Sequence, residues 1–171
     1  MSVVLHDFWR SSACYRVRIA LSLKAIAYAR VVVDLTTGAQ RDPSYRAINP
    51  QAFVPMLEID GLRLTQSLAI CDYLDAKVEV NPFVPADPAA RSRVLAMAMI
   101  IAADVHPLNN LRVLNYLTGT LGASSDARDT WVRTWIAHGF AALEALAVEA
   151  SANKTPYLSG ETPGLADICL V

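Results

Sequence analysis

The sequence predicts an α/β domain with the element order β-α-β-α-β-β-α, followed by an all-α helical domain. Short β-branched and aromatic runs alternate with helically spaced apolar residues over the first 80 residues. After residues 81–88, where three prolines fall within eight positions, only helical spacing is found. We therefore expect two domains, 1–80 and 89–171, joined by a linker at 81–88.

The first strand, helix and second strand form a β-α-β unit. Residues 3–8 are β-branched and aromatic, and from Ala13 apolar residues recur at i, i+4, i+7 and i+8, which places them on one helical face. Lys24 suits the end of that helix. Residues 28–35, rich in valine, form the second strand. Because a strand, a helix and a strand connect in a right-handed crossover, the sheet should begin parallel.

A short helix, a hairpin and a second long helix complete the first domain. Residues 44–48 predict a helix that ends before Asn49-Pro50, since the residue before proline avoids helical geometry. Asp60-Gly61 separates two alternating runs and predicts an antiparallel hairpin. Helical spacing follows at 67–76. This order is that of a thioredoxin-like domain.

The second domain is predicted to be helical throughout. Asp87 before Pro88 is a good helix start, and the helix should run to about His106-Pro107, where a kink or break is expected. Another helical piece continues to Leu117, a loop covers 119–126, and a long helix covers 131–149. A buried helix follows Gly164. Because the chain stops inside that short helix, we expect the helical domain to be incomplete.

Composition excludes several classes of protein. The 171 residues are 54% hydrophobic and carry a net charge of -1, with no long basic block, so a nucleic-acid partner is not expected. The apolar stretch 94–103 is far shorter than a membrane span. The N-terminus has neither the basic start nor the apolar core of a signal peptide. We therefore expect a cytoplasmic protein that does not bind a membrane.

The cysteines and histidines point to neither a disulfide framework nor a metal site. The odd number of cysteines, with no C-x-x-C pair, fits a reducing compartment. No histidine has the partner at i+4 or the flanking cysteines that a zinc site needs. The residues concerned are Cys14, Cys71, Cys169, His6, His106 and His138.

The turn from the first strand into the first helix is the candidate functional site. Arg10, Ser11 and Ser12 stand where unpaired backbone N–H groups and the helix dipole favour an anion. A serine there can cap the helix, or it can point its hydroxyl at a bound nucleophile. Both readings of Ser11 remain open on its residue type alone, and capping is at least as good a role for Ser12.

The whole chain resembles the zeta-class glutathione transferases, a family that includes maleylacetoacetate isomerase and maleylpyruvate isomerase. The order and spacing of five short motifs carry the resemblance. They are Arg10-Ser11-Ser12 with 16–21, Asn49-Pro50, Val54-Pro55, 66–70 and 106–110. The resemblance implies the glutathione transferase fold, a homodimer and glutathione as cofactor.

The resemblance also implies roles for individual residues. Ser11 would hydrogen-bond the glutathione sulfur, Val54 would offer its backbone before a cis Pro55, and Gln66 and Ser67 would hold the γ-glutamyl end. Arg10 is the candidate for a substrate carboxylate, because guanidinium grips carboxylates with two hydrogen bonds. Further contacts to glutathione or substrate are implied for Ser12, Ala13, Cys14, Tyr15, Arg16, Gln40, His106, Asn110, Leu111 and Arg112.

Simpler roles compete at some of these positions, and two positions depart from the family pattern. His106 could satisfy a carbonyl freed at a helix kink, and Arg112 could be a solvent-facing charge. Many zeta members carry a cysteine where this chain has Ala13, so a reactive role for Cys14 is doubtful, although a first helical turn can lower a thiol pKa. Gly164 replaces the threonine of the usual Thr-x-x-Asp capping box.

The implied activity is a glutathione-dependent cis-trans isomerisation of a small unsaturated keto diacid, such as maleylacetoacetate or maleylpyruvate, in aromatic catabolism. A thiolate would add reversibly to the cis double bond. Two alternatives are a transferase acting by conjugation or dehalogenation, and a glutathione-transferase-like binding module without turnover. Consumption of glutathione separates the first alternative from isomerisation, and failure to bind glutathione would favour the second.

Overall fold

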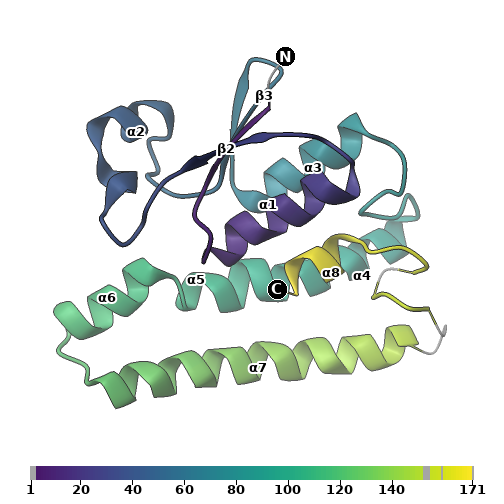
Figure 1. The fold of residues 1–171 in the computed structure, drawn as a ribbon. Helices are drawn as coiled ribbons and strands as arrows, with labels where there is room; N and C mark the ends of the chain where they lie inside the picture. Colours follow the sequence, from purple (N-terminus) through teal and green to yellow (C-terminus); the bar gives the residue numbers. More distant parts are fainter. Residues whose placement is uncertain (1–2, 152–154, 159, 171) are drawn as a thin grey trace. The chain divides into compact units, whose positions relative to one another are not determined.

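The computed structural model describes residues 3–151, 155–158 and 160–170 (Figure 1). They form two compact units that divide between Phe83 and Val84. The first unit contains the mixed sheet and the second is helical, as the sequence predicts. The elements of the first unit are β1 (Val4–Asp7), α1 (Ser12–Leu23), β2 (Ala29–Val32), the 3-10 helix η1 (Ala39–Arg41), α2 (Pro43–Ile48), β3 (Met56–Ile59), β4 (Leu62–Thr65) and α3 (Ser67–Lys77).

The sheet of the first unit has the strand order β2-β1-β3-β4. β1 pairs in parallel with β2 and antiparallel with β3, and β3 and β4 form the predicted antiparallel hairpin. Asp60 and Gly61, at the tip of the hairpin, have φ angles of 54° and 78°. A two-residue hairpin turn of type I′ needs positive φ at both positions, which explains the Asp-Gly pair.

The two faces of the sheet are covered by different helices. Leu5 and Asp7 of β1 are fully buried and share a face, because alternate residues of a strand point the same way. α1 and α3 lie side by side in Figure 1 and pack against each other. His6 points to the opposite face, where its ring centroid lies 5.8 Å from that of Tyr45 in α2. The fully buried apolar core of the unit includes Leu5, Val17, Ala20, Leu21, Met56, Leu57, Ile70 and Leu74.

The second strand is shorter than predicted. The sequence favours a strand over 28–35, but β2 covers only Ala29–Val32 and all four of its residues are exposed. β2 is an edge strand, so its length is set by its single partner, and pairing ends where Asp7 meets Val32. The N–H of Val33 still donates to the carbonyl of Asp7 at 2.9 Å, beyond which β1 has turned away.

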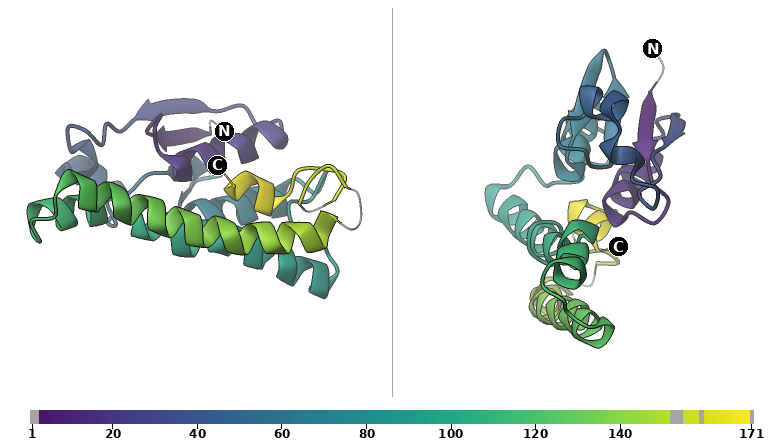
Figure 2. Two further views of the ribbon diagram at one scale, coloured as in Figure 1. Left: turned by 90° about the horizontal axis from the view of Figure 1, so that it is seen from below. Right: turned by 90° about the vertical axis from the view of Figure 1, so that its left-hand side faces the viewer.

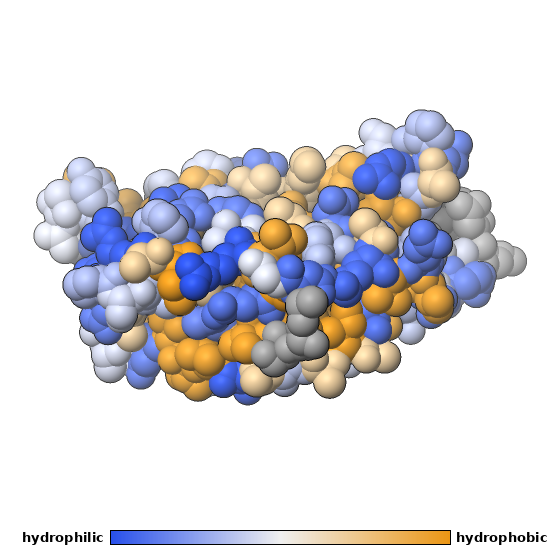
Figure 3. Space-filling view, turned by 90° about the horizontal axis from the view of Figure 1, so that it is seen from above, coloured by the Kyte–Doolittle hydropathy of each residue, from blue (hydrophilic) through white to orange (hydrophobic). Residues whose placement is uncertain are grey.

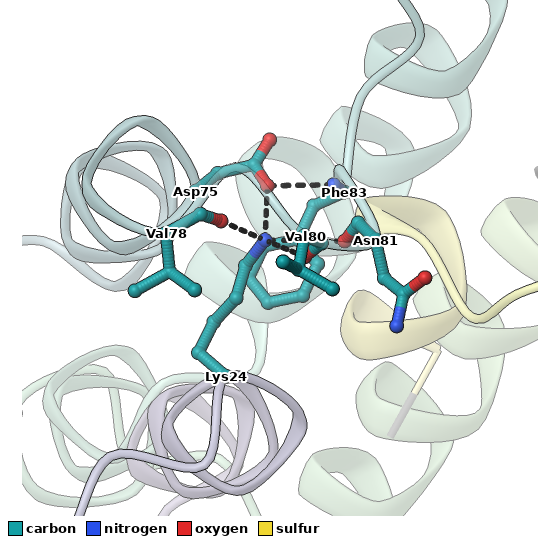
Figure 4. Close-up of polar contacts among 6 residues, drawn as sticks. All are labelled: Lys24, Asp75, Val78, Val80, Asn81 and Phe83. Atoms are coloured by element: carbon teal, nitrogen blue, oxygen red, sulfur yellow. Dashed lines mark hydrogen bonds and ion pairs between the residues drawn. The ribbon is translucent and has the colours of Figure 1, made fainter.

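The ammonium of Lys24 does not bind the C-terminal end of its own helix α1, where the sequence places it. Its side chain is completely buried, and its ammonium donates to Asp75 Oδ1 at 2.8 Å (Figure 4). It also donates to three backbone carbonyls after α3, those of Val78, Val80 and Asn81, at 2.7, 2.9 and 3.1 Å. Lys24 therefore satisfies the carboxyl end of α3 and the segment that follows it.

The second unit consists of helices α4 (Pro88–Met99), α5 (His106–Leu108), α6 (Leu111–Gly119), α7 (Ser125–Ser151) and α8 (Leu165–Cys169), with the π-helix η2 (Ile100–Val105) between α4 and α5. Asp87 caps α4 as predicted, since its Oδ1 accepts the N–H of Ala90 at 2.9 Å. α7 runs alongside the α4–α5 segment in both views of Figure 2 and packs against η2. α8 packs on α4.

The break expected at about His106-Pro107 lies just after it, at Asn109 and Asn110 between α5 and α6. The helix widens to π geometry over Ile100–Val105, and the N–H of His106 donates to the carbonyl of Ile101, five residues earlier. Pro107 has no N–H to donate, and the wider turn lets the helix pass through it. The helix then ends at Asn109, and Asn110 starts α6. Proline changes the hydrogen-bonding here without breaking the helix.

Two helix starts in this unit show how capping sets the boundaries. α7 begins at Ser125, not at residue 131, because Ser124 Oγ accepts the N–H of Ala127 at 3.2 Å. Gly164 begins α8 without a hydroxyl, yet Asp167 Oδ2 still accepts the N–H of Gly164 at 2.8 Å. Half of the family capping box is therefore retained. The buried helix predicted after Gly164 is confirmed as α8.

Apolar and charged residues are mixed on the face of the molecule drawn in Figure 3. Among the described residues, the run from Pro88 to Gly119 is long and apolar enough by length and composition to cross a membrane, as core helices of soluble proteins also are.

Candidate active site

Ser11 is the N-cap of α1. Its Oγ accepts the N–H of Cys14 at 3.2 Å, and its own N–H donates to the carbonyl of Phe8 at 3.0 Å. A hydroxyl can accept two hydrogen bonds and donate one, so capping leaves the O–H of Ser11 available to an outside acceptor. The two roles considered for Ser11, helix cap and anion donor, are thus compatible. Ser12 is the first residue of the helix.

An open cleft of about 310 Å³ lies at this turn. Its lining brings together four of the predicted site residues and adds Trp9 and Arg18; the full set is Trp9, Arg10, Ser11, Ser12, Tyr15 and Arg18. The Arg10 guanidinium lies 5.7 Å from the centroid of the exposed Trp9 ring, and that of Arg18 lies 5.1 Å from the Tyr15 ring. Two cations, each against an aromatic ring, therefore flank Ser11.

The two arginines of the cleft differ in how their charge is balanced. Arg18 Nη1 lies 2.6 Å from Asp7 Oδ1, an ion pair whose carboxylate is fully buried. In the described part of the chain, Arg10 forms no ion pair, and its side chain is exposed. Arg10 is therefore the cation available to a substrate carboxylate, whereas the charge of Arg18 is already neutralised.

Cys14 is not a reactive thiol. Its side chain is fully buried, and burial, more than any other influence, raises the pKa of Cys14 to about 12. The hydrogen bond from Ser11 acts in the opposite direction but is outweighed. A first helical turn can lower a thiol pKa, but this expectation is wrong for Cys14, whose thiol pKa is raised. Cys14 can meet a ligand only through its backbone.

Cys14→Ala should consequently retain nearly all activity. At neutral pH the native Cys14 side chain is a thiol in the folded protein, so an alkylating reagent should not modify it until the protein unfolds. Mass spectrometry of the native and the urea-unfolded protein after alkylation checks this. Rapid labelling of Cys14 in the native state, with loss of activity, would contradict the assignment.

Val54 and Pro55 lie immediately before β3, and the peptide bond between them is cis, as the resemblance implies. The loop in front of them is held by two side chains that donate to the Phe53 carbonyl. Tyr45 Oη donates at 2.6 Å and Asn49 Nδ2 at 2.7 Å. α2 thus fixes the backbone next to Val54.

Gln66 and Ser67 form the start of α3. Gln66 has a φ angle of 67°, which is uncommon for a residue other than glycine and typical of functional sites, and its Nε2 donates to Gln51 Oε1 at 2.7 Å. Ser67 Oγ accepts from Arg16 Nη1 at 2.9 Å. Because Arg16 is only 2% exposed, a buried positive charge stands behind the N-terminus of α3.

Gln40 and Ala13 lie apart from the cleft lining. Gln40 is the central residue of η1, and its Oε1 is a buried acceptor with no hydrogen-bond partner among the described residues. A ligand that donates a hydrogen bond would satisfy it. Ala13 is buried in the first turn of α1, so only its backbone faces the turn.

The remaining predicted residues belong to the helical unit. His106 begins α5, and Asn110 caps α6 through its Oδ1, which accepts the N–H of Arg112 at 3.1 Å. Leu111 is 43% exposed, and Arg112 is exposed as well. The carboxamide N–H₂ of Asn110 remains a donor after capping.

Comparison with known proteins assigns the chain to a family. The model of the glutathione S-transferase N-terminal domain matches residues 10–77. Maleylacetoacetate isomerase from Rhizobium meliloti (strain 1021) is 45% identical over 168 residues, which are 98% of this chain and 78% of that protein. A holo structure of maleyl pyruvate isomerase, a bacterial zeta-class glutathione transferase, has a TM-score of 0.94 at 41% identity, over 98% of this chain and 78% of that one.

This chain is a zeta-class glutathione transferase. A further member of the family, maleylacetoacetate isomerase from Methylobacterium extorquens AM1, was crystallised with bound malonate and glutathione. Its TM-score is 0.88 at 40% identity, over 98% of this chain and 78% of that chain.

In this glutathione transferase, sequence reasoning missed the residues that support the site from behind. Tyr45, Asn49 and Asp7 make their key contacts with residues elsewhere in the sheet unit. Asp7 is an acid within a buried strand, and such a residue needs a partner. That signal could have suggested a pair with one of the arginines of the following helix.

Proposed function

We propose that this glutathione transferase is a glutathione-dependent cis-trans isomerase of a small unsaturated keto diacid, maleylacetoacetate or maleylpyruvate. One observation carries the proposal. The O–H of Ser11, at a helix N-terminus, can donate to a sulfur, and beside it stands Arg10, a cation without a carboxylate partner among the described residues. A thiolate site next to a carboxylate site is what reversible addition to an unsaturated diacid requires.

The groups of the sheet unit suit the parts of glutathione. Ser11 would hold the sulfur and the backbone of Val54 the cysteinyl part. Ser67, with Arg16 behind it at 2.9 Å, would hold the γ-glutamyl carboxylate at the start of α3. The buried Oε1 of Gln40, which lacks a partner within the described residues, accepts a further donor. When bound, glutathione supplies a thiolate that adds to the cis double bond and leaves once that bond has rotated.

The chain's own residues make this addition possible at neutral pH. The Ser11 hydroxyl and the positive end of α1 stabilise a negative sulfur, which lowers the pKa of a thiol there from its usual value near 8.5. Arg10 grips a carboxylate of the substrate and holds the double bond beside the sulfur. His106, Asn110, Leu111 and Arg112 are proposed to contact glutathione or substrate from the helical unit. We also propose that the protein is cytoplasmic and forms a homodimer.

Arg10→Met should raise KM for the keto diacid by about tenfold or more, because a charged hydrogen bond to a carboxylate is lost. The affinity for glutathione, measured by calorimetry, should change little. Arg63→Met is a matched control, because Arg63 is an exposed arginine of β4 that lies outside the cleft. An unchanged KM in Arg10→Met would remove Arg10 from substrate binding.

The proposed reaction is tested by following the ultraviolet absorbance of maleylacetoacetate and maleylpyruvate with the enzyme, with and without glutathione. Isomerisation of at least one substrate should require glutathione. Isomerisation at the same rate without glutathione, or formation of a stable glutathione conjugate as the only product, would contradict the proposal.

A further inference from the structure

A buried carboxylate lies behind the Ser11 cleft. Asp7, the last residue of β1, has no exposed surface, and two arginines pair with it from different elements. Arg18 of α1 reaches Oδ1 at 2.6 Å, and Arg30 of β2 reaches Oδ2 at 2.5 Å. Arg30 is 45% exposed, whereas Arg18 is 18% exposed and lines the cleft.

Arg18 also holds the turn that carries the candidate catalytic groups. Its Nη2 donates to the carbonyl of Trp9 at 3.1 Å, and its guanidinium lies against the Tyr15 ring. Arg10 and Ser11 directly follow Trp9. The planar fork of arginine can bind a carboxylate and a carbonyl at once, which the single ammonium of lysine does in poorer geometry.

The charge of Asp7 is felt in the first turn of α1, which begins at the Ser11 cap. Cys14, whose N–H donates to Ser11 Oγ, is influenced by both groups: burial is the largest cause of the raised pKa of its thiol, the Ser11 hydrogen bond lowers that pKa, and repulsion from Asp7 raises it by a smaller amount. A buried charge acts over a longer range than an exposed one, because water does not screen it. Of the two arginines that offset this charge, only Arg18 lines the cleft, so without Arg18 the carboxylate of Asp7, paired with Arg30 alone, would oppose a thiolate there.

We propose that Arg18 is a positioning residue of this enzyme: it cancels the charge of Asp7 behind the cleft and fixes the turn that presents Arg10 and Ser11. The proposal rests on the glutathione-dependent reaction proposed above. Asp7 in turn keeps the guanidinium of Arg18 in place, so Arg18 supports the site and leaves Arg10 to bind substrate.

The charged and titratable groups around this position come from four elements and the turn. They are Asp7 of β1, Arg10 of the turn, Cys14, Tyr15 and Arg18 of α1, Arg30 of β2 and Tyr45 of α2. Of these groups Asp7 is the only carboxylate, so its balance with Arg18 and Arg30 sets the local potential.

The test is a pH titration of the enzyme–glutathione complex, followed by the ultraviolet absorbance of the thiolate. Arg18→Met should move the titration midpoint upward by about one to two pH units, because a positive charge is lost from the cleft lining and Asp7 keeps only Arg30 as its counter-charge. The double variant Arg18→Met/Asp7→Asn should return the midpoint close to the wild-type value. A merely structural role of Arg18 would not produce this reversal.

Three further variants make the result decisive. Arg63→Met, a matched exposed arginine, should leave the midpoint unchanged. Arg18→Lys should keep the midpoint near wild type but lower kcat several-fold, since the charge remains and the bond to Trp9 is lost. Asp7→Asn alone should not raise the midpoint of the titration. This variant still tests the proposal if Arg18→Met fails to fold.

The outcomes separate this proposal from the function itself. A wild-type midpoint below that of free glutathione, raised in Ser11→Ala but unmoved in Arg18→Met, would overturn the role of Arg18 and leave the proposed function standing. A raised midpoint in Asp7→Asn would also overturn it. A wild-type midpoint equal to that of free glutathione would overturn both.

Discussion

Ser11→Ala should lower kcat by about 10²- to 10³-fold at neutral pH, the usual cost of removing one preorganised donor from a developing or bound anion. The Ser11 hydroxyl is the side-chain donor best placed at the N-terminus of α1, and alanine leaves only the backbone to stabilise a sulfur. Because the bound thiol would then ionise at higher pH, the loss should shrink as the pH is raised. A pH-rate profile at saturating glutathione measures both effects.

The same substitution should cost little stability. Loss of the cap bond to Cys14 N–H removes about 1 kcal/mol from the free energy of unfolding. Ser12→Ala is the matched control, since Ser12 is the neighbouring serine in the same cleft but is not the N-cap. It should reduce kcat far less. Near-normal kcat in Ser11→Ala would disprove the role of Ser11 as thiolate donor.

Lys24→Met should lower the free energy of unfolding by about 3–5 kcal/mol, which is the cost of removing one partner from a buried ion pair. Methionine keeps an unbranched side chain that is one atom shorter, and it removes the ammonium, which lies 4.3 Å from the centroid of the Phe83 ring. It leaves the carboxylate of Asp75 and three carbonyls without their donor. Urea unfolding followed by circular dichroism and by tryptophan fluorescence measures the change.

Two companions isolate the cause of that loss. Lys24→Met/Asp75→Asn should recover part of the stability, because the uncompensated charge is gone while the amide oxygen can still accept from the N–H of Phe83. Lys77→Met removes a lysine from the exposed pair with Asp60 and should have a much smaller effect. Equal losses in Lys24→Met and Lys77→Met would contradict the importance of burial.

Features decided by neighbouring residues could be predicted from the sequence. The Asp60-Gly61 hairpin, the Asp87 cap and the start of α1 at Ser11-Ser12 each depend on interactions within a few positions. The cis bond at Val54-Pro55 was predicted from the family resemblance alone, because the neighbouring residues by themselves favour a trans proline. The parallel pairing of the first two strands was also predicted from the sequence, through the right-handed β-α-β connection.

Features decided by distant partners were beyond the sequence. Lys24 meets Asp75 across 51 positions, so its burial cannot be seen from the end of a helix. The length of β2 depends on where β1 turns, and the π-helix depends on how the chain passes Pro107. At the site, Ser11 and Arg10 could be predicted from the sequence. The role of Arg18 could not, because it depends on the ion pair with Asp7 that only the structure shows.

The central claim is that glutathione enters the reaction and leaves it unchanged. A count of free glutathione during many turnovers of maleylacetoacetate or maleylpyruvate tests it most directly. The account predicts that the trans product accumulates in large excess over the enzyme while the concentration of free glutathione stays constant. Loss of one glutathione for each substrate consumed would contradict it and would identify the enzyme as a conjugating transferase.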